Sequence, residues 1–421
     1  MFDILSYYLE NGMRVMLHKE PGIKLITIGV IINQGSMNES NETNGISHFL
    51  EHMIVNLSCQ NQDTLDLFEE LHEHGADYNA ITDKAMTSYY ISGFASGLKT
   101  YLKLLKQIVY HHRSFSDEAI TNEKKIVERE LVSYYASLNQ ISDRAIQALY
   151  GSKSVGRIIV GSKENLNAFT IDEILSVLSD TYIAENSALV IFGDFDYSQA
   201  VQLIDEHFSD IPDNITKQYH ETVTSTPSIY YNSNYNGENA VLTLCFRNMI
   251  DSCKNDALDI VLSGLCNPTL TKRAAFILRN ETGLSYNVGG FYRAIKNYIG
   301  YGITSVFKAE NAPEVLKVLI ESINVLKKDG FSEKETGIIK KNVLKDRLYT
   351  NSNIQRQSDQ LIRMAVSPYV YSPDNEIRKI ERLELDQLNS LLNDLLNSNR
   401  MGLACIGRCD IDAMIKVLDN A

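Results

Sequence analysis

Two histidines and a glutamate at close spacing in the first half of the chain have the pattern of a catalytic metal site. His48 and His52 are four residues apart, so on a helix both imidazoles project from one face and can reach one ion about 2 Å from each nitrogen. Glu51 lies beside them, where a carboxylate can accept a proton from water at the metal without being a ligand. This order of residues predicts a zinc site that performs hydrolysis. The alternative is a helix with two surface histidines and a salt-bridging glutamate.

A catalytic zinc ion needs a third protein ligand and leaves one position to water. The acidic helix predicted around residues 121–131 offers three candidates. Glu123 and Glu130 are seven residues apart and share a face, whereas Glu128 points elsewhere. One face therefore offers a ligand and a residue that contacts a ligand. Spacing alone does not choose among the three glutamates. The alternative is that residues 121–131 form an acidic, solvated helix surface with no role at a metal.

The residues around the motif predict a sheet that precedes and follows the metal-binding helix. A turn at Asn11-Gly12 joins the strands of a hairpin, and the β-branched segment 25–32 predicts a further strand. Helical periodicity begins near Asn44, which places the motif on a helix that follows these strands. The expected strands are 7–10, 13–18, 25–32 and 87–93, and the expected helices are 44–54, 64–74, 98–111 and 116–138.

Two stretches of the chain resemble each other and indicate a duplication. In residues 172–193 and again in residues 386–407, a helix that starts at an aspartate leads into an apolar strand that ends at a glycine. The aspartate and the glycine are 21 residues apart in both stretches, and the copies lie 214 residues apart. The simpler alternative is that helix-then-strand is a common unit. Because the polar stretch 210–227 lies between the copies, we expect an N-terminal domain of residues 1–215 and a C-terminal domain of residues 216–421.

Length and composition exclude several classes of protein. The chain has 421 residues, of which 44% are hydrophobic, enough for two domains with their own cores. A formal net charge of -13 disfavours binding to nucleic acid or to an anionic membrane surface. We find no signal peptide and no apolar run of about 18 residues that would predict a membrane span. The six cysteines form no C-x-x-C pair, so we expect free thiols and a soluble, cytoplasmic protein.

The chain resembles the pitrilysin family of zinc peptidases, with the processing-peptidase-like branch as the closest match. The resemblance lies in residues 45–53, Gly-Ile-Ser-His-Phe-Leu-Glu-His-Met, and in residues 75–82, Gly-Ala-Asp-Tyr-Asn-Ala-Ile-Thr. It implies that Glu130 is the third zinc ligand and that Glu123 orients a ligand from behind. After residue 53 the family usually continues with two aromatic residues and Lys-Gly-Thr, which this chain lacks, so its choice of substrate is expected to be unusual.

The same resemblance implies further site residues in both halves. Asn79 and Ala80 would lie on an edge strand that holds an extended peptide by strand addition. Residues 278–288, Leu-Arg-Asn-Glu-Thr-Gly-Leu-Ser-Tyr-Asn-Val, resemble the family's C-terminal pair of arginine and tyrosine. Arg279 would hold the substrate, and the Tyr286 hydroxyl would donate to the oxyanion of the tetrahedral intermediate.

The fold implied by the family is α+β, with two homologous halves that are each a mainly antiparallel sheet covered by helices. The implied function is that of a metalloendopeptidase with one zinc ion per chain, which cleaves short or unfolded polypeptides and is a candidate for processing a leader peptide or a modified peptide. Members of this length form half of a closed chamber, so we expect a homodimer or a heterodimer with a related subunit. The alternatives are a non-catalytic assembly subunit and a protein that binds peptides by strand addition without cutting them.

Overall fold

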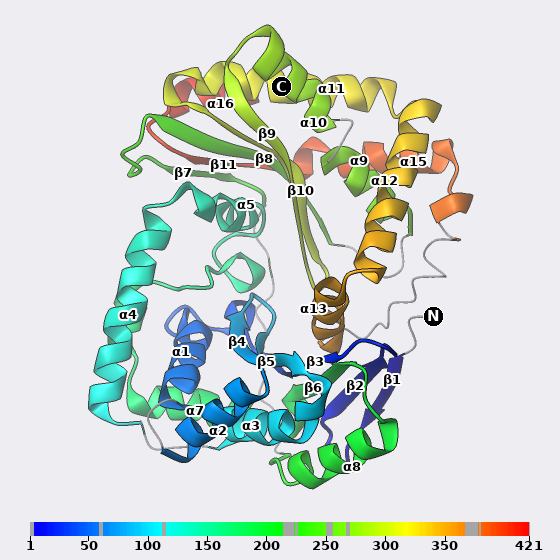
Figure 1. Cartoon of the computed structure of the whole chain (residues 1–421). Coiled ribbons are helices and arrows are strands. Elements are labelled where there is room, and N and C mark those ends of the chain that lie inside the picture. Colours follow the sequence, from blue (N-terminus) through cyan, green and yellow to red (C-terminus); the bar gives the residue numbers. More distant parts are fainter. Residues whose placement is uncertain are drawn as a thin grey trace. The chain divides into compact units, whose positions relative to one another are not determined.

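The chain forms two compact units in a computed structural model that describes residues 4–58, 62–111, 115–213, 223, 226–249, 256–266, 270–366, 378 and 380–420 (Figure 1). The first unit consists of Met1–Leu131, Arg157–Glu221 and Thr350–Pro373, and the second of Val132–Gly156, Thr222–Tyr349 and Asp374–Ala421. Each unit therefore combines segments that are far apart in the sequence.

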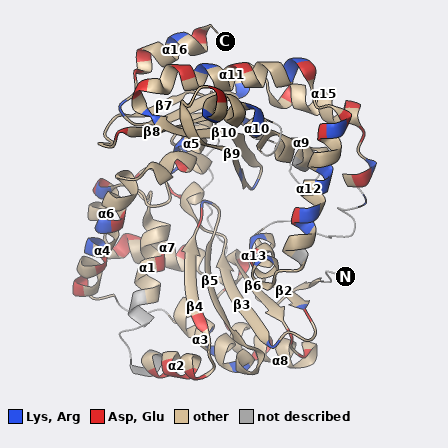
Figure 2. Ribbon diagram, turned by 45° about the horizontal axis from the view of Figure 1, so that its top comes forward, with Lys and Arg blue, Asp and Glu red and all other residues tan. Residues whose placement is uncertain are grey.

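A six-stranded sheet in the order β1-β2-β6-β3-β5-β4 forms the centre of the first unit. Neighbouring strands are antiparallel, except β2 and β6, which are parallel. The central strands β3, β5 and β6 carry no charged residue (Figure 2), as expected for strands that are covered on both faces. The strands are β1 (Ile4–Tyr8), β2 (Arg14–Lys19), β3 (Leu25–Ile32), β4 (Asp77–Thr82), β5 (Thr87–Phe94) and β6 (Ser187–Gly193).

The first strand ends earlier than the sequence predicts. We expected a strand over residues 7–10, but β1 ends at Tyr8 because the turn begins at Leu9, whose N–H donates to the carbonyl of Met13 at 2.9 Å. The remaining expected elements of this half agree with the structure to within a few residues. The helices of this half in the first unit are α1 (Ile46–Ser58), α2 (Gln62–Glu73), α3 (Leu98–Tyr110), α4 (Asp117–Tyr135, whose last four residues belong to the second unit), α6 (Lys163–Ala168), α7 (Ile171–Thr181) and α8 (Tyr197–Phe208).

A helix from the second half of the chain covers one face of this first sheet. Helix α13 (Ile354–Ala365) packs against β2, β3 and β6, and α3 packs on the other side of the sheet (Figure 1). Leu361 of α13 is fully buried in a cluster with Met16, Ile31 and Val190. Because side chains alternate across a strand, this explains why β6 is apolar at every position from Ala188 to Phe192.

The second unit contains a five-stranded sheet in the order β7-β11-β8-β10-β9, antiparallel except for the parallel pair β7 and β11. Helix α5 (Ile141–Tyr150), which comes from the first half of the chain, packs against β8 and β11. The other elements are β7 (Ile229–Asn232), β8 (Asn239–Met249), β9 (Ser285–Ile295), β10 (Tyr298–Lys308), β11 (Met401–Ile406), α9 (Asp256–Cys266), α10 (Leu270–Ala275), the π-helical turn η6 (Phe276–Glu281), α11 (Ala312–Asp329), α12 (Glu333–Asn351), α15 (Leu385–Leu395) and α16 (Ile411–Asp419).

The two halves repeat the same local structures. Helix α7 leads into β6 in the first half, and α15 leads into β11 in the second, as the repeated stretches predict. A glycine with a positive φ stands at the end of each strand: Gly193, at φ 144°, is the last residue of β6, and Gly407, at φ 135°, directly follows β11. At Gly193 a Cβ atom would lie 2.4 Å from the carbonyl oxygen of Leu25, so only glycine fits. The predicted α+β fold with two homologous halves is thus confirmed.

Two further predictions from composition bear on the described residues. Cys245, Cys266, Cys405 and Cys409 are free thiols. None of the helices in the described part of the chain is long and apolar enough to cross a membrane.

Candidate metal centre

Helix α1 carries the predicted motif and is fixed by its apolar face. Ile46, Phe49, Leu50 and Met53 are buried and recur at the spacing of one helix face, so they hold α1 in the first unit. Several other positions of α1 lie outside this apolar face. They include the two histidines and the glutamate of the motif, which are only partly exposed.

A buried carboxylate fixes the start of α1. Glu39 is 2% exposed and accepts hydrogen bonds at 2.8 Å from the backbone N–H groups of Gly45 and Ser47 and from the side-chain amide of Asn44. These donors belong to the N-terminus of α1, which has unpaired N–H groups and favours negative charge. Burial raises the pKa of Glu39, and the hydrogen bonds from Asn44, Gly45 and Ser47 oppose that rise. Sequence reasoning missed this residue, although an acidic side chain shortly before a helix start is a usable signal.

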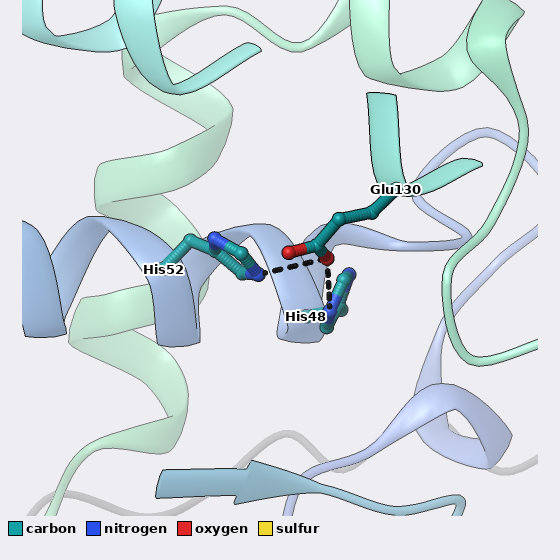
Figure 3. A group of neighbouring side chains, drawn as sticks. All are labelled: His48, His52 and Glu130. Carbon is teal, nitrogen blue, oxygen red and sulfur yellow. Dashed lines mark ion pairs between the residues drawn. The ribbon is translucent and has the colours of Figure 1, made fainter. Parts of the chain in front are cut away.

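Three potential ligands converge between α1 and α4. Nε2 of His52 lies 3.3 Å from Oε2 of Glu130, and Nε2 of His48 lies 3.6 Å from the same oxygen. Figure 3 shows the Glu130 carboxylate reaching towards both imidazoles. One ligand atom from each of the three residues lies within 4.8 Å of the others. Ligands about 2 Å from a tetrahedral zinc ion are separated by about 3.3 Å, so this donor set fits zinc.

Helix α4 separates the three glutamates that the sequence left open. Glu123 is 4% exposed, and its Oε1 lies 2.9 Å from Nδ1 of His52, on the side of the imidazole that faces away from Glu130. Glu128 lies elsewhere on the helix, where it forms an ion pair with Lys163. A carboxylate behind a histidine fixes its tautomer and orientation, which is the usual arrangement around a metal-binding histidine.

The pKa values of the two histidines are shifted in opposite directions. Burial, with a smaller contribution from repulsion by His52, lowers the pKa of His48 to about 4, so its imidazole is neutral at neutral pH. Burial alone would lower the pKa of His52 as well, but the hydrogen bond that His52 donates to Glu123 and the charges of Glu130, Glu123 and Glu51 outweigh burial and raise that pKa. In the metal-free protein, His52 is therefore the imidazole on which a proton competes with a cation.

Glu51 lies beside the three potential ligands but forms a hydrogen bond with a different residue. Its Oε2 accepts a hydrogen bond of 2.5 Å from the hydroxyl of Thr82. Burial raises the pKa of Glu51, while the Thr82 hydrogen bond opposes that rise. A carboxylate with a raised pKa near a metal is suited to taking up a proton from water. Sequence reasoning did not find this contact, because Thr82 is far from Glu51 along the chain.

Asn79 and Ala80 lie on β4, the last strand of the first sheet. The Asn79 side-chain amide donates to the hydroxyl of Tyr90 at 3.2 Å, and its oxygen accepts from the N–H of Ala80 at 2.9 Å. In the described part of the chain β4 pairs only with β5, so its other edge is open to an added strand.

Arg279 and Tyr286 belong to the second unit. Arg279 lies in the π-helical turn η6, and Tyr286 follows near the start of β9; both are exposed, the tyrosine to 58%. No metal-binding cluster other than that of His48, His52 and Glu130 occurs among the residues that the structure describes.

Comparison with known proteins agrees with this site. Residues 14–163 match the model of the insulinase family, peptidase family M16, and residues 168–343 match that of the peptidase M16 inactive domain. A Bacillus subtilis protein described as an uncharacterized zinc protease is 24% identical over 94% of this chain and 96% of its own length. The beta subunit of the mitochondrial-processing peptidase from Lentinula edodes is 31% identical over 48% of this chain and 44% of its own length. A protease structure from Helicobacter pylori has a TM-score of 0.84 at 16% identity, covering 96% of this chain and all of that one. The chain therefore belongs to the M16 family, which contains insulinase and pitrilysin.

Proposed function

We propose that this protein is a zinc metalloendopeptidase in which His48, His52 and Glu130 hold one zinc ion per chain. The observation that carries the proposal is the pair of distances, 3.3 Å and 3.6 Å, from the Glu130 carboxylate to the two imidazoles. They match the separation of ligands around one tetrahedral zinc ion. The description of relatives as zinc proteases supports the same metal.

Each residue of the site has a distinct role in the proposed hydrolysis of a peptide bond. Bound zinc would polarise the substrate carbonyl and make water more acidic. Glu51 takes the proton from that water and passes it to the leaving amine, for which its raised pKa is suited. Glu123 accepts a hydrogen bond from His52 and keeps the opposite ring nitrogen directed at the ion. By resemblance to the family, Arg279 would hold the substrate and Tyr286 would donate a hydrogen bond to the oxyanion.

The proposed substrates are short or unfolded polypeptides. An extended peptide can pair with the open edge of β4 at Asn79 and Ala80, whereas a folded protein has few unpaired strands to offer. A processing role on a leader peptide or a modified peptide belongs to this proposal, because a processing-peptidase subunit is among the relatives. A second subunit, either a copy of this chain or a related one, would complete the enzyme.

A non-catalytic assembly subunit is the second candidate function, because residues 168–343 match a domain described as inactive. The intact set of two histidines and two glutamates on α1 and α4 favours the enzyme. A subunit without catalysis has no need of such a set.

The decisive experiment compares two glutamates that lie two residues apart on α4. Glu130→Gln removes a proposed ligand, whereas Glu128→Gln makes the same change in charge at a residue paired with Lys163. Wild type and Glu128→Gln should contain about one zinc ion per chain and cleave a quenched peptide library in a chelator-sensitive manner. Glu130→Gln should bind zinc weakly, and Glu51→Gln should keep zinc but lose cleavage. An inert wild type without bound zinc would support the assembly subunit.

A further inference from the structure

We propose that Thr82 is a positioning residue that keeps Glu51 available as the general base by holding its carboxylate away from the metal ligands. This inference rests on the proposed peptidase function and concerns why Glu130 serves as a ligand while Glu51 serves as the general base. The hydroxyl of Thr82 donates to Oε2 of Glu51 at 2.5 Å.

Glu51 needs such a restraint because its position on α1 also suits a ligand. It lies three residues after His48 and directly before His52, so its side chain starts from nearly the same face of the helix as a proposed ligand. Zinc in proteins binds carboxylate oxygen as well as imidazole nitrogen. Nevertheless, the cluster of mutually close ligand atoms contains His48, His52 and Glu130 and not Glu51, among the residues that the structure describes. A fourth protein ligand would close the position that hydrolysis needs for water.

The donor is on a backbone that is fixed from two sides. Thr82 is the last residue of β4 and pairs with Thr87 of β5, and the N–H of Asp83 donates to the carbonyl of Met86 at 2.8 Å to close the hairpin turn. The N–H of Met37 donates to the carbonyl of Lys84 at 2.9 Å and ties this turn to the segment that leads to α1.

Close packing holds the turn in the same place. At Gly35, an added Cβ atom would lie 2.2 Å from the carbonyl oxygen of Asp83, so the two backbones touch directly. The Thr82 hydroxyl is therefore a donor at a fixed place, and it can select one orientation of the longer, more flexible Glu51 side chain.

The arrangement also joins the proposed peptide-binding strand to the base. Thr82 ends the strand whose open edge carries Asn79 and Ala80, so a peptide that adds to β4 lies along the element that orients Glu51. The register of the substrate and the position of the base are thus set by one strand. This is why we assign the role to Thr82 rather than to a residue of α1 itself.

Thr82→Val removes the hydroxyl but keeps the shape and the β-branching that favour a strand. We expect kcat for a quenched peptide to fall about 10- to 100-fold, the usual effect of removing a group that orients a metal-site residue, with little change in KM. Zinc affinity, measured by competition with a chelating dye, should not fall, because all three ligands remain and Glu51 is released towards the ion. Thr82→Ser keeps the hydroxyl and should retain most of the wild-type kcat.

Cobalt(II) substitution gives a readout that does not depend on activity. Its visible absorption reports the number and kind of ligands, so entry of the Glu51 carboxylate should change the spectrum of Thr82→Val but not that of Thr82→Ser. Ser88→Ala is the matched control, because it removes a hydroxyl from the adjacent strand β5 whose contact with the Ile81 carbonyl is long, at 3.5 Å. That variant should match the wild type in kcat, zinc affinity and spectrum.

The inference is overturned if Thr82→Val keeps wild-type kcat, if it loses zinc together with activity, or if its cobalt spectrum is that of the wild type. Those results differ from a failure of the proposed function itself. If the wild type neither binds zinc nor cleaves peptides, the peptidase proposal fails before any variant is compared.

Discussion

Replacement of Glu123 by glutamine tests whether the carboxylate behind His52 tunes the metal site. Glu123 is 4% exposed and lies 2.9 Å from Nδ1 of His52. Glutamine has the same shape and can still accept a hydrogen bond through its oxygen, so the substitution removes charge and little else. Loss of such a partner lowers metal affinity about 10- to 100-fold, or about 1.4–2.7 kcal/mol of binding free energy.

The loss of zinc affinity in Glu123→Gln should become smaller as the pH falls. The Glu123 hydrogen bond and charge contribute to raising the pKa of His52, so a proton competes with zinc at a higher pH in the wild type than in the variant. Above both pKa values neither protein carries that proton, and the full loss of affinity is measured. As the pH falls through the wild-type pKa, the wild type loses affinity first, so the difference between the two proteins narrows.

Zinc competition titrations at a series of pH values between about 8 and 5.5 measure this difference directly, since that range spans the ordinary histidine pKa. Glu128→Gln is the control, because it removes the same charge from α4 at a residue paired with Lys163 rather than His52. Its zinc affinity should follow the wild-type curve. A Glu123→Gln variant with unchanged affinity, or with a loss that grows on acidification, would refute the reasoning.

Three further substitutions test the stability of the folded protein. Because burial lowers the pKa of His48 to about 4, folding favours the neutral imidazole, and this contribution to stability is lost as the pH falls from 6.5 towards 4. In urea titrations of the metal-free proteins between pH 7 and pH 5, the free energy of unfolding should therefore fall on the order of 2 kcal/mol more for the wild type than for His48→Gln. Tyr150→Phe removes a buried hydroxyl whose oxygen lies 2.8 Å and 2.7 Å from the carbonyl oxygens of Asn248 and Ile299, and should lower the free energy of unfolding by about 1–3 kcal/mol in denaturant titrations. Leu361→Ala, at a fully buried position of α13, should lower it by about 2–5 kcal/mol, and a loss below 1 kcal/mol would contradict the packing of α13 on the first sheet.

The local features of the fold could be predicted from the sequence because each depends on neighbouring residues. The β-branched run 25–32 has the bounds of β3, and the turn at Asn11-Gly12 connects β1 to β2. The repeated helix and strand were visible because the capping and glycine positions that they require are short-range features. In both copies the residue before the helix forms a capping box, with Thr170 in the first and Glu384 in the second.

Contacts between distant segments were not predictable in the same way. An apolar helix face indicates that α13 is buried, but it does not say on which sheet, and α13 packs on a sheet built from the other half of the chain. The hydrogen bonds of Glu39 with the start of α1 and of Thr82 with Glu51 likewise join residues whose types are common on protein surfaces. Their roles follow only from burial and distance, which a single sequence does not contain.

The two halves of the chain share an arrangement of helix and strands, but only the first carries the histidine motif on that helix. Helix α9 follows β8 and packs on β9 and β10 in the second unit, as α1 follows β3 and packs on β4 and β5 in the first. Yet α9, Asp-Ala-Leu-Asp-Ile-Val-Leu-Ser-Gly-Leu-Cys, contains no histidine, and its apolar residues Leu258, Val261, Leu262 and Leu265 are buried in the core. The same arrangement of helix and strands therefore forms around a helix that lacks the paired histidines of α1, so this arrangement does not require them. In small zinc domains, by contrast, metal binding supplies the free energy of folding. The proposed ligands on α1 and α4 would then be free to be arranged for reactivity, with the Glu51 carboxylate held by Thr82.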